Sequence, residues 1–262
     1  KNKKFNGSIS FLITGDEEGL AINGTKKVVD YLKKRKEKID FCIVGEPTNP
    51  NKLGEMIKIG RRGSLSGKIE ITGIQGHVAY PHLSNNPINT LINICKKLKE
   101  KKLDNGNKNF QPSNLEFTSI NVDNKAHNVI PARAKAQFNI RYNNHQNSVK
   151  LRRKIVLVVE NFCKKNKCKF KIDFTVNGDS FLTKPNKTIF MAKNIIKRVT
   201  KVSPKFSTTG GTSDARFIRK ISPCLEFGLV NKTMHKVDEC VSLIDLKNLT
   251  KIYKNILEDY FK

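Results

Sequence analysis

Apolar residues in the first part of the chain form two short, unbroken runs with a helical pattern between them. The runs are "SISFLIT" at residues 8–14 and "DFCIVG" at residues 40–45, and a continuous apolar pattern is typical of a strand covered on both faces. The stretch between them, "NGTKKVVDYLKKRK" at residues 23–36, predicts a crossover helix. We therefore expect a βαβ unit here.

The middle of the chain predicts a different arrangement, with alternating strands and two helices in the order β-α-β-β-α-β. That order is typical of the ferredoxin-like split βαβ fold, an antiparallel sheet with two helices on one face, which can fold as its own domain. The predicted elements, in chain order, are "GSLSGKIEITG" (63–73), "NPINTLINICKKLKEKK" (86–102), "LEFTSINV" (115–122), "ARAKAQFNIRY" (132–142), "SVKLRRKIVLVVENFCKKN" (148–166) and "KFKIDFTVN" (169–177).

After Gly178 the pattern returns to α/β character. We expect a helix at about residues 187–200, the Gly-rich turn "STTGGTSDARF", the strand "CLEFG" and a closing helix. The closing helix carries an apolar stripe at helical spacing: Leu246, Leu249, Ile252, Tyr253, Ile256, Leu257 and Tyr260. The sequence thus predicts a mixed, largely parallel α/β domain (1–60 and 177–262) interrupted by an inserted α+β domain (61–176).

Composition excludes several classes of protein. The 262 residues carry 50 Lys and Arg against 23 Asp and Glu, a net charge of +27, yet the excess is nearly all Lys spread along the chain without an aromatic-interleaved basic stripe. We interpret it as a solvated basic surface that can steer an anionic substrate. The six cysteines are scattered, so we expect no disulfides. Neither a membrane span nor a signal peptide is present in the sequence, which favours a cytoplasmic protein.

Acidic residues gather where two predicted strands end. Glu17 and Glu18 follow the first apolar run in "GDEEG", and Glu46 follows the second in "VGEPT". Ligands in open α/β sheets bind outside the carboxyl ends of strands, and several like charges held together there call for a cation. Alone, each Glu would be interpreted as a helix cap or a surface turn. His235, in the loop after "CLEFG", completes a typical zinc ligand set and predicts a metal-assisted hydrolase.

Several motifs in order resemble one known family. "LITGDEEG", "CIVGEPT", "GIQGHVAYPHLSNNPI", "HNVIPARA" and "FGLVNKTMHKVDECV" together resemble the M20 family of dinuclear zinc amidohydrolases and peptidases, over essentially the whole chain. Within the family, "KIGRRGSLSG" and "TTGGTSDARF" are most similar to the branch that hydrolyses N-succinyl-LL-2,6-diaminopimelate to succinate and LL-2,6-diaminopimelate, a step towards lysine and cell-wall precursors. The resemblance implies two Zn²⁺ ions per subunit, with Co²⁺ or Mn²⁺ as substitutes, and a homodimer formed through the inserted domain.

The resemblance also implies a role for individual residues. Glu17 matches the general base, Glu18 and His235 match ligands of one zinc, and Glu46 matches a ligand of the other. His77 matches a residue of the inserted domain that reaches into the partner subunit's site to stabilise the oxyanion. The positions that match substrate-binding residues are Arg61, Ser64, Tyr80, Asn128, Arg141, Gly211, Thr212 and Asn231.

Some of these positions also have simpler interpretations. Without the family, His77 would be interpreted as a strand-end histidine and Arg141 as half of a cross-strand ion pair, and the glycines as parts of a tight turn. We interpret Asp214 and Arg216 as residues that support the structure rather than as catalytic residues.

One departure from the family pattern stands out. The family supplies another zinc-binding His, in an HxD motif, and a bridging Asp upstream of its first Glu pair, and none of the five histidines here lies in such a motif. We therefore expect these ligands upstream of Lys1, and expect the chain by itself to be inactive. The alternatives that remain open are a related M20 acetylornithine deacetylase, aminoacylase or carboxypeptidase, a non-catalytic homologue, and a basic nucleic-acid binder.

Overall fold

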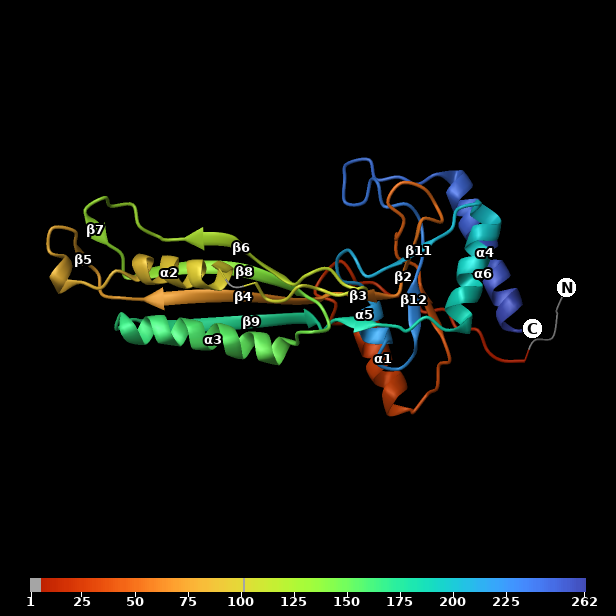
Figure 1. Cartoon of the computed structure of the whole chain (residues 1–262), viewed down its shortest axis with the longest axis horizontal. Coiled ribbons are helices and arrows are strands. Elements are labelled where there is room, and N and C mark those ends of the chain that lie inside the picture. The colour runs from red at the N-terminus through yellow and green to blue at the C-terminus, as the bar shows by residue number, and fades with distance from the viewer. Residues whose placement is uncertain (1–5, 101) are drawn as a thin grey trace. The chain divides into compact units, whose positions relative to one another are not determined.

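The computed structural model describes residues 6–100 and 102–262. These residues form two compact units: unit 1 comprises the chain up to Arg61 together with Phe181–Lys262, and unit 2 comprises Arg62–Ser180. Figure 1 shows the elements of both units along the chain. No helix among the described residues is long and apolar enough to cross a membrane.

Unit 2 is built on one antiparallel sheet with the strand order β6-β8-β4-β9. Its elements are β4 (Gly63–Thr72), β5 (Gly76–His77), η1 (Pro81–Leu83), α2 (Pro87–Glu100), β6 (Asn114–Asn121), β7 (Val129–Ile130), β8 (Arg133–Tyr142), α3 (Ser148–Lys165) and β9 (Lys169–Gly178). The predicted βαββαβ order is therefore confirmed. The sequence pattern missed the short β5 and β7, which pair with each other outside the main sheet.

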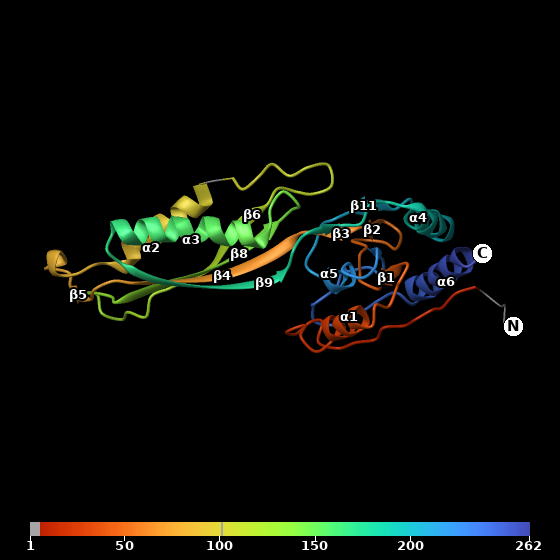
Figure 2. The ribbon, with the colours of Figure 1, turned by 90° about the horizontal axis from the view of Figure 1, so that it is seen from below.

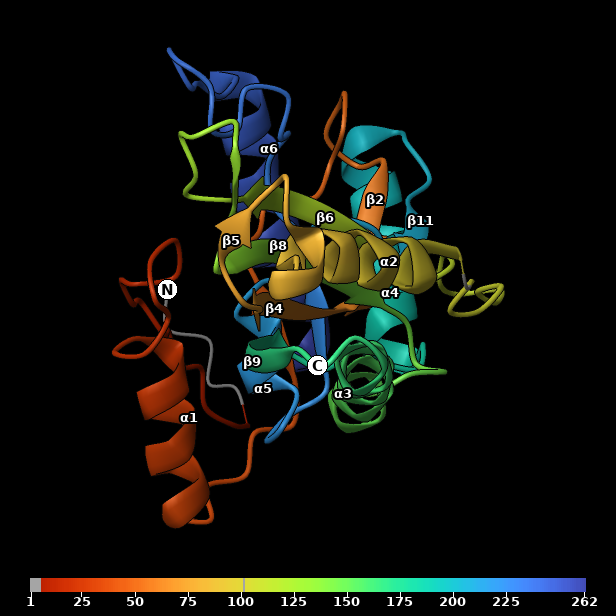
Figure 3. The same cartoon turned by 90° about the vertical axis from the view of Figure 1, so that its left-hand side faces the viewer.

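Both helices of unit 2 cover the same face of this sheet, as Figure 2 shows, and Figure 3 shows α3 end-on beside the strands. The alternation along the strands explains this, because successive side chains in a strand point to opposite faces. Leu65, Ile69 and Ile140 are buried against α2 and α3 in one core. Phe138 belongs to that core and lies opposite Gly67, where a Cβ atom would come within 2.2 Å of the Phe138 ring.

Unit 1 contains a mixed four-stranded sheet with the order β1-β12-β2-β11. The strands are β1 (Cys42–Val44), β2 (Met56–Lys58), β11 (Lys205–Ser207) and β12 (Cys224–Glu226). β1 pairs with β12 and β2 with β11 in parallel, whereas β12 and β2 are antiparallel. The short strands β3 (Gly60–Arg61) and β10 (Phe181–Leu182) form a separate antiparallel pair. The predicted α/β class with a mixed sheet is confirmed.

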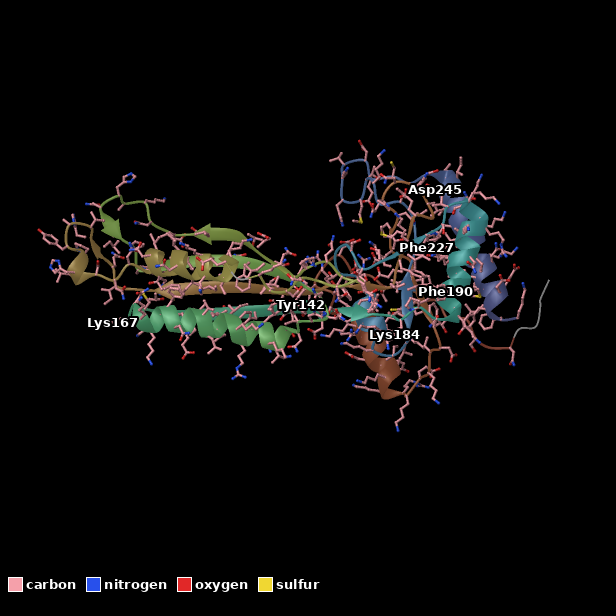
Figure 4. The ribbon with its side chains drawn as sticks, viewed as in Figure 1. Tyr142, Lys167, Lys184, Phe190, Phe227 and Asp245 are labelled. Atoms are coloured by element: carbon pink, nitrogen blue, oxygen red, sulfur yellow. The ribbon has the colours of Figure 1, made fainter. Side chains whose placement is uncertain are left out.

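The helices of unit 1 are α1 (Thr25–Lys34), α4 (Lys187–Thr200), α5 (Ala215–Ile218) and α6 (Leu243–Tyr260). α4 and α6 lie side by side in Figure 1 and bury Ile196, Ile252 and Ile256 in a core with the sheet. Phe227, which follows β12 (Figure 4), is fully buried in the same core. The predicted stripe of α6 is buried only in part, because Leu246 is 45% exposed.

One predicted strand is wrong. Residues 8–14 form no strand, and Phe11 and Ile13 are 83% and 92% exposed. A strand is stabilised by hydrogen bonds to a neighbour, and no strand among residues 6–100 and 102–262 pairs with this segment. The expected βαβ unit therefore consists of α1 and β1 without its first strand.

Candidate active site

The acidic turn at residues 15–24 precedes α1 and divides its three carboxylates between two roles. Asp16 adopts a left-handed backbone (φ 65°) and accepts hydrogen bonds from the backbone N–H groups of Ile22 and Asn23 at 2.7 and 2.9 Å. These bonds lower the pKa of Asp16, since they favour its charged form. The carboxylate of Asp16 thus stabilises the turn through these backbone hydrogen bonds.

Glu17 lies in an environment that opposes its ionisation. Burial raises the pKa of this carboxyl, and the charges of Asp214 and Glu18 raise it further, while Arg216 and Arg61 act in the opposite direction. A carboxyl with a raised pKa is closer to neutral pH and better matched to accept a proton during catalysis. The environment of Glu17 therefore suits the general-base role that its position implies.

Glu46 follows β1 in a loop held firmly in place. Gly228 allows the backbone after β12 to approach this loop, since a Cβ atom there would lie 2.4 Å from the Glu46 carbonyl oxygen. The fully buried Asn49 donates to the Gly228 carbonyl at 2.7 Å and accepts from the N–H groups of Gly54 and Met56 at 3.1 and 3.0 Å. Asn49 therefore anchors the segment that carries Glu46, a role that its position in a polar loop did not reveal.

The charges around Glu46 fit the binding of a cation. Burial raises the pKa of its carboxyl to about 7, with a further contribution from Glu226 and with Glu17 and Asp214 acting in the same direction, whereas Arg61 opposes them. Carboxylates that raise one another's pKa repel each other, and a divalent ion relieves this repulsion. The donor chemistry at this end of the sheet thus fits a divalent metal.

The remaining predicted ligands, His235 and Glu18, form a pair. His235 Nε2 lies 3.8 Å from Glu18 Oε1 although 217 positions separate them in the chain. His235 has a left-handed backbone (φ 60°), and its N–H donates to Glu239 at 3.1 Å. In the described ranges, no three His, Cys, Asp or Glu side chains lie close enough to hold a metal ion. The described residues therefore supply a pair of ligands rather than a complete set.

A buried ion pair that sequence reasoning missed lies beside these acids. Glu226 is 1% exposed and accepts from Arg61 Nε at 3.0 and 2.9 Å, from Arg61 Nη2, and from Ser213 Oγ at 2.7 Å. The signal was present, because Glu226 is the only charged residue in the apolar run "CLEFG". Arg61, predicted to bind substrate, is thus already bound to a protein carboxylate.

The Gly-rich turn after β11 rests on the same network. Arg61 Nη1 donates to the carbonyls of Thr209 and Gly211 at 3.5 and 3.3 Å, and Lys58 Nζ donates to Thr209 Oγ1 at 2.6 Å. Burial lowers the pKa of Lys58 to about 8, and Arg61 contributes to this. Gly211 is exposed, so its surface remains free for a ligand. Asn231 is bound elsewhere, donating to the Pro47 carbonyl at 3.3 Å.

The predicted site residues of unit 2 fall into two groups. In the first, Asn128 Nδ2 lies 3.5 Å from His77 Nε2, and the ring of Tyr80 lies 5.9 Å from that of His77. All three side chains are exposed. In the second, Ser64 pairs with Arg141 across β4 and β8. Ser64 is fully buried and accepts a hydrogen bond from Asn139 at 3.2 Å.

Known proteins resemble this chain along almost its entire length. Residues 59–167 match a family described as the M20 peptidase dimerisation domain. A succinyl-diaminopimelate desuccinylase of Pelagibacter ubique is 65% identical over 99% of this chain and 68% of its own length. One of Methylobacterium radiotolerans is 50% identical over 98% of this chain and 66% of its own. The chain thus spans about two thirds of these relatives.

Solved structures share the fold at low sequence identity. An aminopeptidase PepT from Bacillus cereus superposes with a TM-score of 0.77 at 16% identity, covering 95% of this chain and 63% of that one. An M20 family metallo-carboxypeptidase from Sulfolobus solfataricus gives a TM-score of 0.70 at 17% identity, with 94% and 69% covered. Membership of this family implies dependence on a divalent metal. Because identity to a named relative reaches 65% over 99% of the chain and residues 59–167 match the M20 dimerisation domain, the chain belongs to the M20 family of metal-dependent hydrolases, in the group of the succinyl-diaminopimelate desuccinylases.

Proposed function

We propose that the protein hydrolyses the amide of N-succinyl-LL-2,6-diaminopimelate, giving succinate and LL-2,6-diaminopimelate for lysine and diaminopimelate synthesis. The observation that carries this proposal is the 65% identity, over 99% of the chain, to a relative named for that reaction. The pairing of Glu18 with His235, which are distant in sequence, supports it, because both match ligands of a single metal ion.

We assign two Zn²⁺ ions to the complete site, with Glu18 and His235 holding one and Glu46 holding the other. When bound, zinc would polarise the scissile carbonyl and make the attacking water more acidic. Glu17 accepts the proton of that water and passes it to the leaving amine. Its raised pKa supports this role, since a carboxylate with a pKa nearer to neutral is a stronger base and accepts the proton of water more readily.

The chain's other polar residues bind the substrate in this proposal. Donors of unit 1 (Arg61, Gly211, Thr212 and Asn231) and of unit 2 (Ser64, Tyr80, Asn128 and Arg141) hold its carboxylates and amine. His77 stabilises the oxyanion in the partner subunit's site of a homodimer. The backbone N–H of Ala79, which donates to His77 Nδ1 at 3.1 Å, supports this assignment, because a neutral imidazole that accepts at Nδ1 carries its proton on Nε2.

Steady-state kinetics test the proposal. They are measured on protein expressed from the complete reading frame that contains these residues. We expect kcat/KM for succinyl-diaminopimelate to exceed that for acetylornithine by at least about 100-fold. The variant Glu17→Gln should lower kcat by at least about 1,000-fold. The expected metal content is two zinc ions per subunit, reduced by Glu18→Gln. A preference for acetylornithine would assign the chain to a deacetylase, and absence of both metal and turnover would assign it to a non-catalytic homologue.

A further inference from the structure

Two arginines at one end of the unit 2 sheet share the face that carries no helix. Arg141 on β8 lies directly opposite Ser64 on β4 and Asn114 on β6, so these three side chains point to the same face. Arg62 precedes Ser64 by two positions and shares its face. It also reaches across the sheet, because its Nη1 donates to Asn114 Oδ1 at 3.0 Å. Arg62 and Arg141 are thus held on one polar surface by the register of three strands.

These two guanidinium groups keep donors without partners. Arg62 Nε and Arg141 Nη1 are each buried and make no hydrogen bond. Within the described part of unit 2, no carboxylate forms an ion pair with either group. Burial lowers the pKa of Arg62, and the positive charge of Arg141 lowers it further. Buried, unsatisfied cationic donors are costly for a fold, and an anion would satisfy both.

The cations at the other end of the helix-free face of the unit 2 sheet do have acidic partners. Arg133, on the same strand and face as Arg141, lies 3.9 Å from Glu70, and Lys135 lies 3.9 Å from Glu70 and 3.6 Å from Asp123. Cations towards that end therefore have acidic partners. At the Arg62 end, Glu116 on β6 is paired with Lys99 at 2.7 Å, so among the described residues of unit 2 no acid is paired with Arg62 or Arg141.

Arg61 and Arg62 are adjacent in sequence and differ in what they bind. Arg61 donates to Glu226 and to the carbonyls of the Gly-rich turn. Arg62 keeps a free Nε beside Arg141. We propose that Arg62 acts with Arg141 as a paired clamp for a carboxylate of the substrate, with Ser64 and Asn114 beside it. A planar guanidinium suits this task, because its fork of N–H groups matches the two oxygens of a carboxylate. The inference rests on the proposed function for the identity of the substrate.

Binding of free carboxylates to the 262-residue chain tests the clamp without turnover. Succinate and LL-2,6-diaminopimelate, titrated separately by calorimetry, represent the two ends of the substrate. Arg62→Gln should weaken the binding of one of them about 10- to 100-fold, as expected for loss of a charge-assisted hydrogen bond. Arg62→Lys, which keeps the charge without the fork, should recover part of the loss. The matched control Arg133→Gln should change binding less than about twofold.

The pattern of results decides the inference. Weaker succinate binding places the succinyl carboxylate on the clamp, and weaker diaminopimelate binding places an amino-acid carboxylate there. The inference is overturned if wild type binds neither ligand, or if Arg62→Gln and Arg133→Gln have equal effects. Hydrolysis by the full-length protein is measured separately. If the chain binds carboxylate through Arg62 but the full-length protein does not hydrolyse succinyl-diaminopimelate, the proposed function is rejected and the clamp is retained.

In the full-length enzyme, the clamp makes a further prediction about specificity. Arg62→Gln should lower kcat/KM for succinyl-diaminopimelate about 10- to 100-fold, mainly through KM, because the carboxylate is held in both ground and transition states. An equal loss for an acetyl substrate, combined with unchanged succinate binding, would assign Arg62 a structural role instead.

Discussion

Arg61 Nε donates to both carboxylate oxygens of Glu226 across 165 positions of sequence, at 3.0 and 2.9 Å, in a site where neither residue is exposed by more than 8%. This pair joins β3 to β12 and supports the Gly-rich turn through the other nitrogens of Arg61. A buried pair of this kind resists removal of one partner, since the remaining charge has no water to solvate it.

Replacing Glu226 by Gln should therefore destabilise the fold by about 3–5 kcal/mol, because it leaves the Arg61 charge buried and unpaired. The free energy of unfolding in urea measures this. The exposed pair Lys97 and Glu100, 3.8 Å apart, provides the control: Lys97→Ala should cost less than about 1 kcal/mol. A loss below about 1 kcal/mol for Glu226→Gln would show that the pair contributes little to stability.

Stability of the metal-free chain should depend on pH through Glu46. Its pKa in the folded state is about 7 against an ordinary 4.5, so the stability that its neutral form provides is lost as the pH rises through 7. Glu46→Gln stays neutral and should become more stable than wild type above pH 7, by up to about 2 kcal/mol once solvent screening is allowed for. The two proteins should differ least below pH 4.5.

Urea midpoints at pH 5, 6, 7 and 8 measure that difference. The exposed Glu258 on α6 provides a control, and the difference between wild type and Glu258→Gln should stay flat over the same range. A Glu46→Gln difference that does not grow with pH would contradict the burial of this charge.

Asn49 should contribute strongly to stability although it carries no charge. Asn49→Ala removes four hydrogen bonds from a fully buried site and leaves backbone groups unsatisfied, at an expected cost of about 2–4 kcal/mol. The free energy of unfolding in urea measures this. Asn51→Ala, at an exposed position nearby, should cost less than about 0.5 kcal/mol. Equal effects of the two changes would contradict the anchoring role.

Any side chain at Gly67 should destabilise the unit 2 sheet. A Cβ atom there would lie 2.2 Å from the Phe138 ring, so Gly67→Ala should destabilise the chain by about 1–3 kcal/mol. The penalty should shrink when Phe138→Ala is present, because the clash is then removed, and a double-mutant cycle measures this coupling. Lys68→Ala, at an exposed position on the opposite face, serves as control. An unchanged penalty in the Phe138→Ala background would locate the strain elsewhere.

The trans role proposed for His77 can be tested by complementation in the full-length protein. Glu17→Gln and His77→Ala should each be inactive alone. Mixing the two variants should form dimers with one intact site, restoring about a quarter of wild-type activity if subunits exchange at random. Activity is measured before and after unfolding and refolding of the mixture. If His77 acts within its own subunit, no activity returns on mixing.

The sequence by itself determined the elements whose patterns are local. The alternation in β4 and β8 and the helical spacing in α2, α3 and α4 are written in neighbouring residues, and unit 2 formed in the predicted order as a result. The functional class also came from the sequence, because the acidic motifs and His235 carry the family's pattern.

Only the tertiary structure decided which side chains meet. Residues 8–14 have the pattern of a strand and form none, since a strand depends on a partner that the segment itself does not encode. Likewise, the sequence does not distinguish the adjacent residues Arg61 and Arg62. In the folded chain, Arg61 is bound to the buried carboxylate of Glu226, whereas Arg62 keeps an unpaired Nε beside Arg141. Long-range pairing fixes the charge that surrounds each side chain, and that charge sets its chemistry.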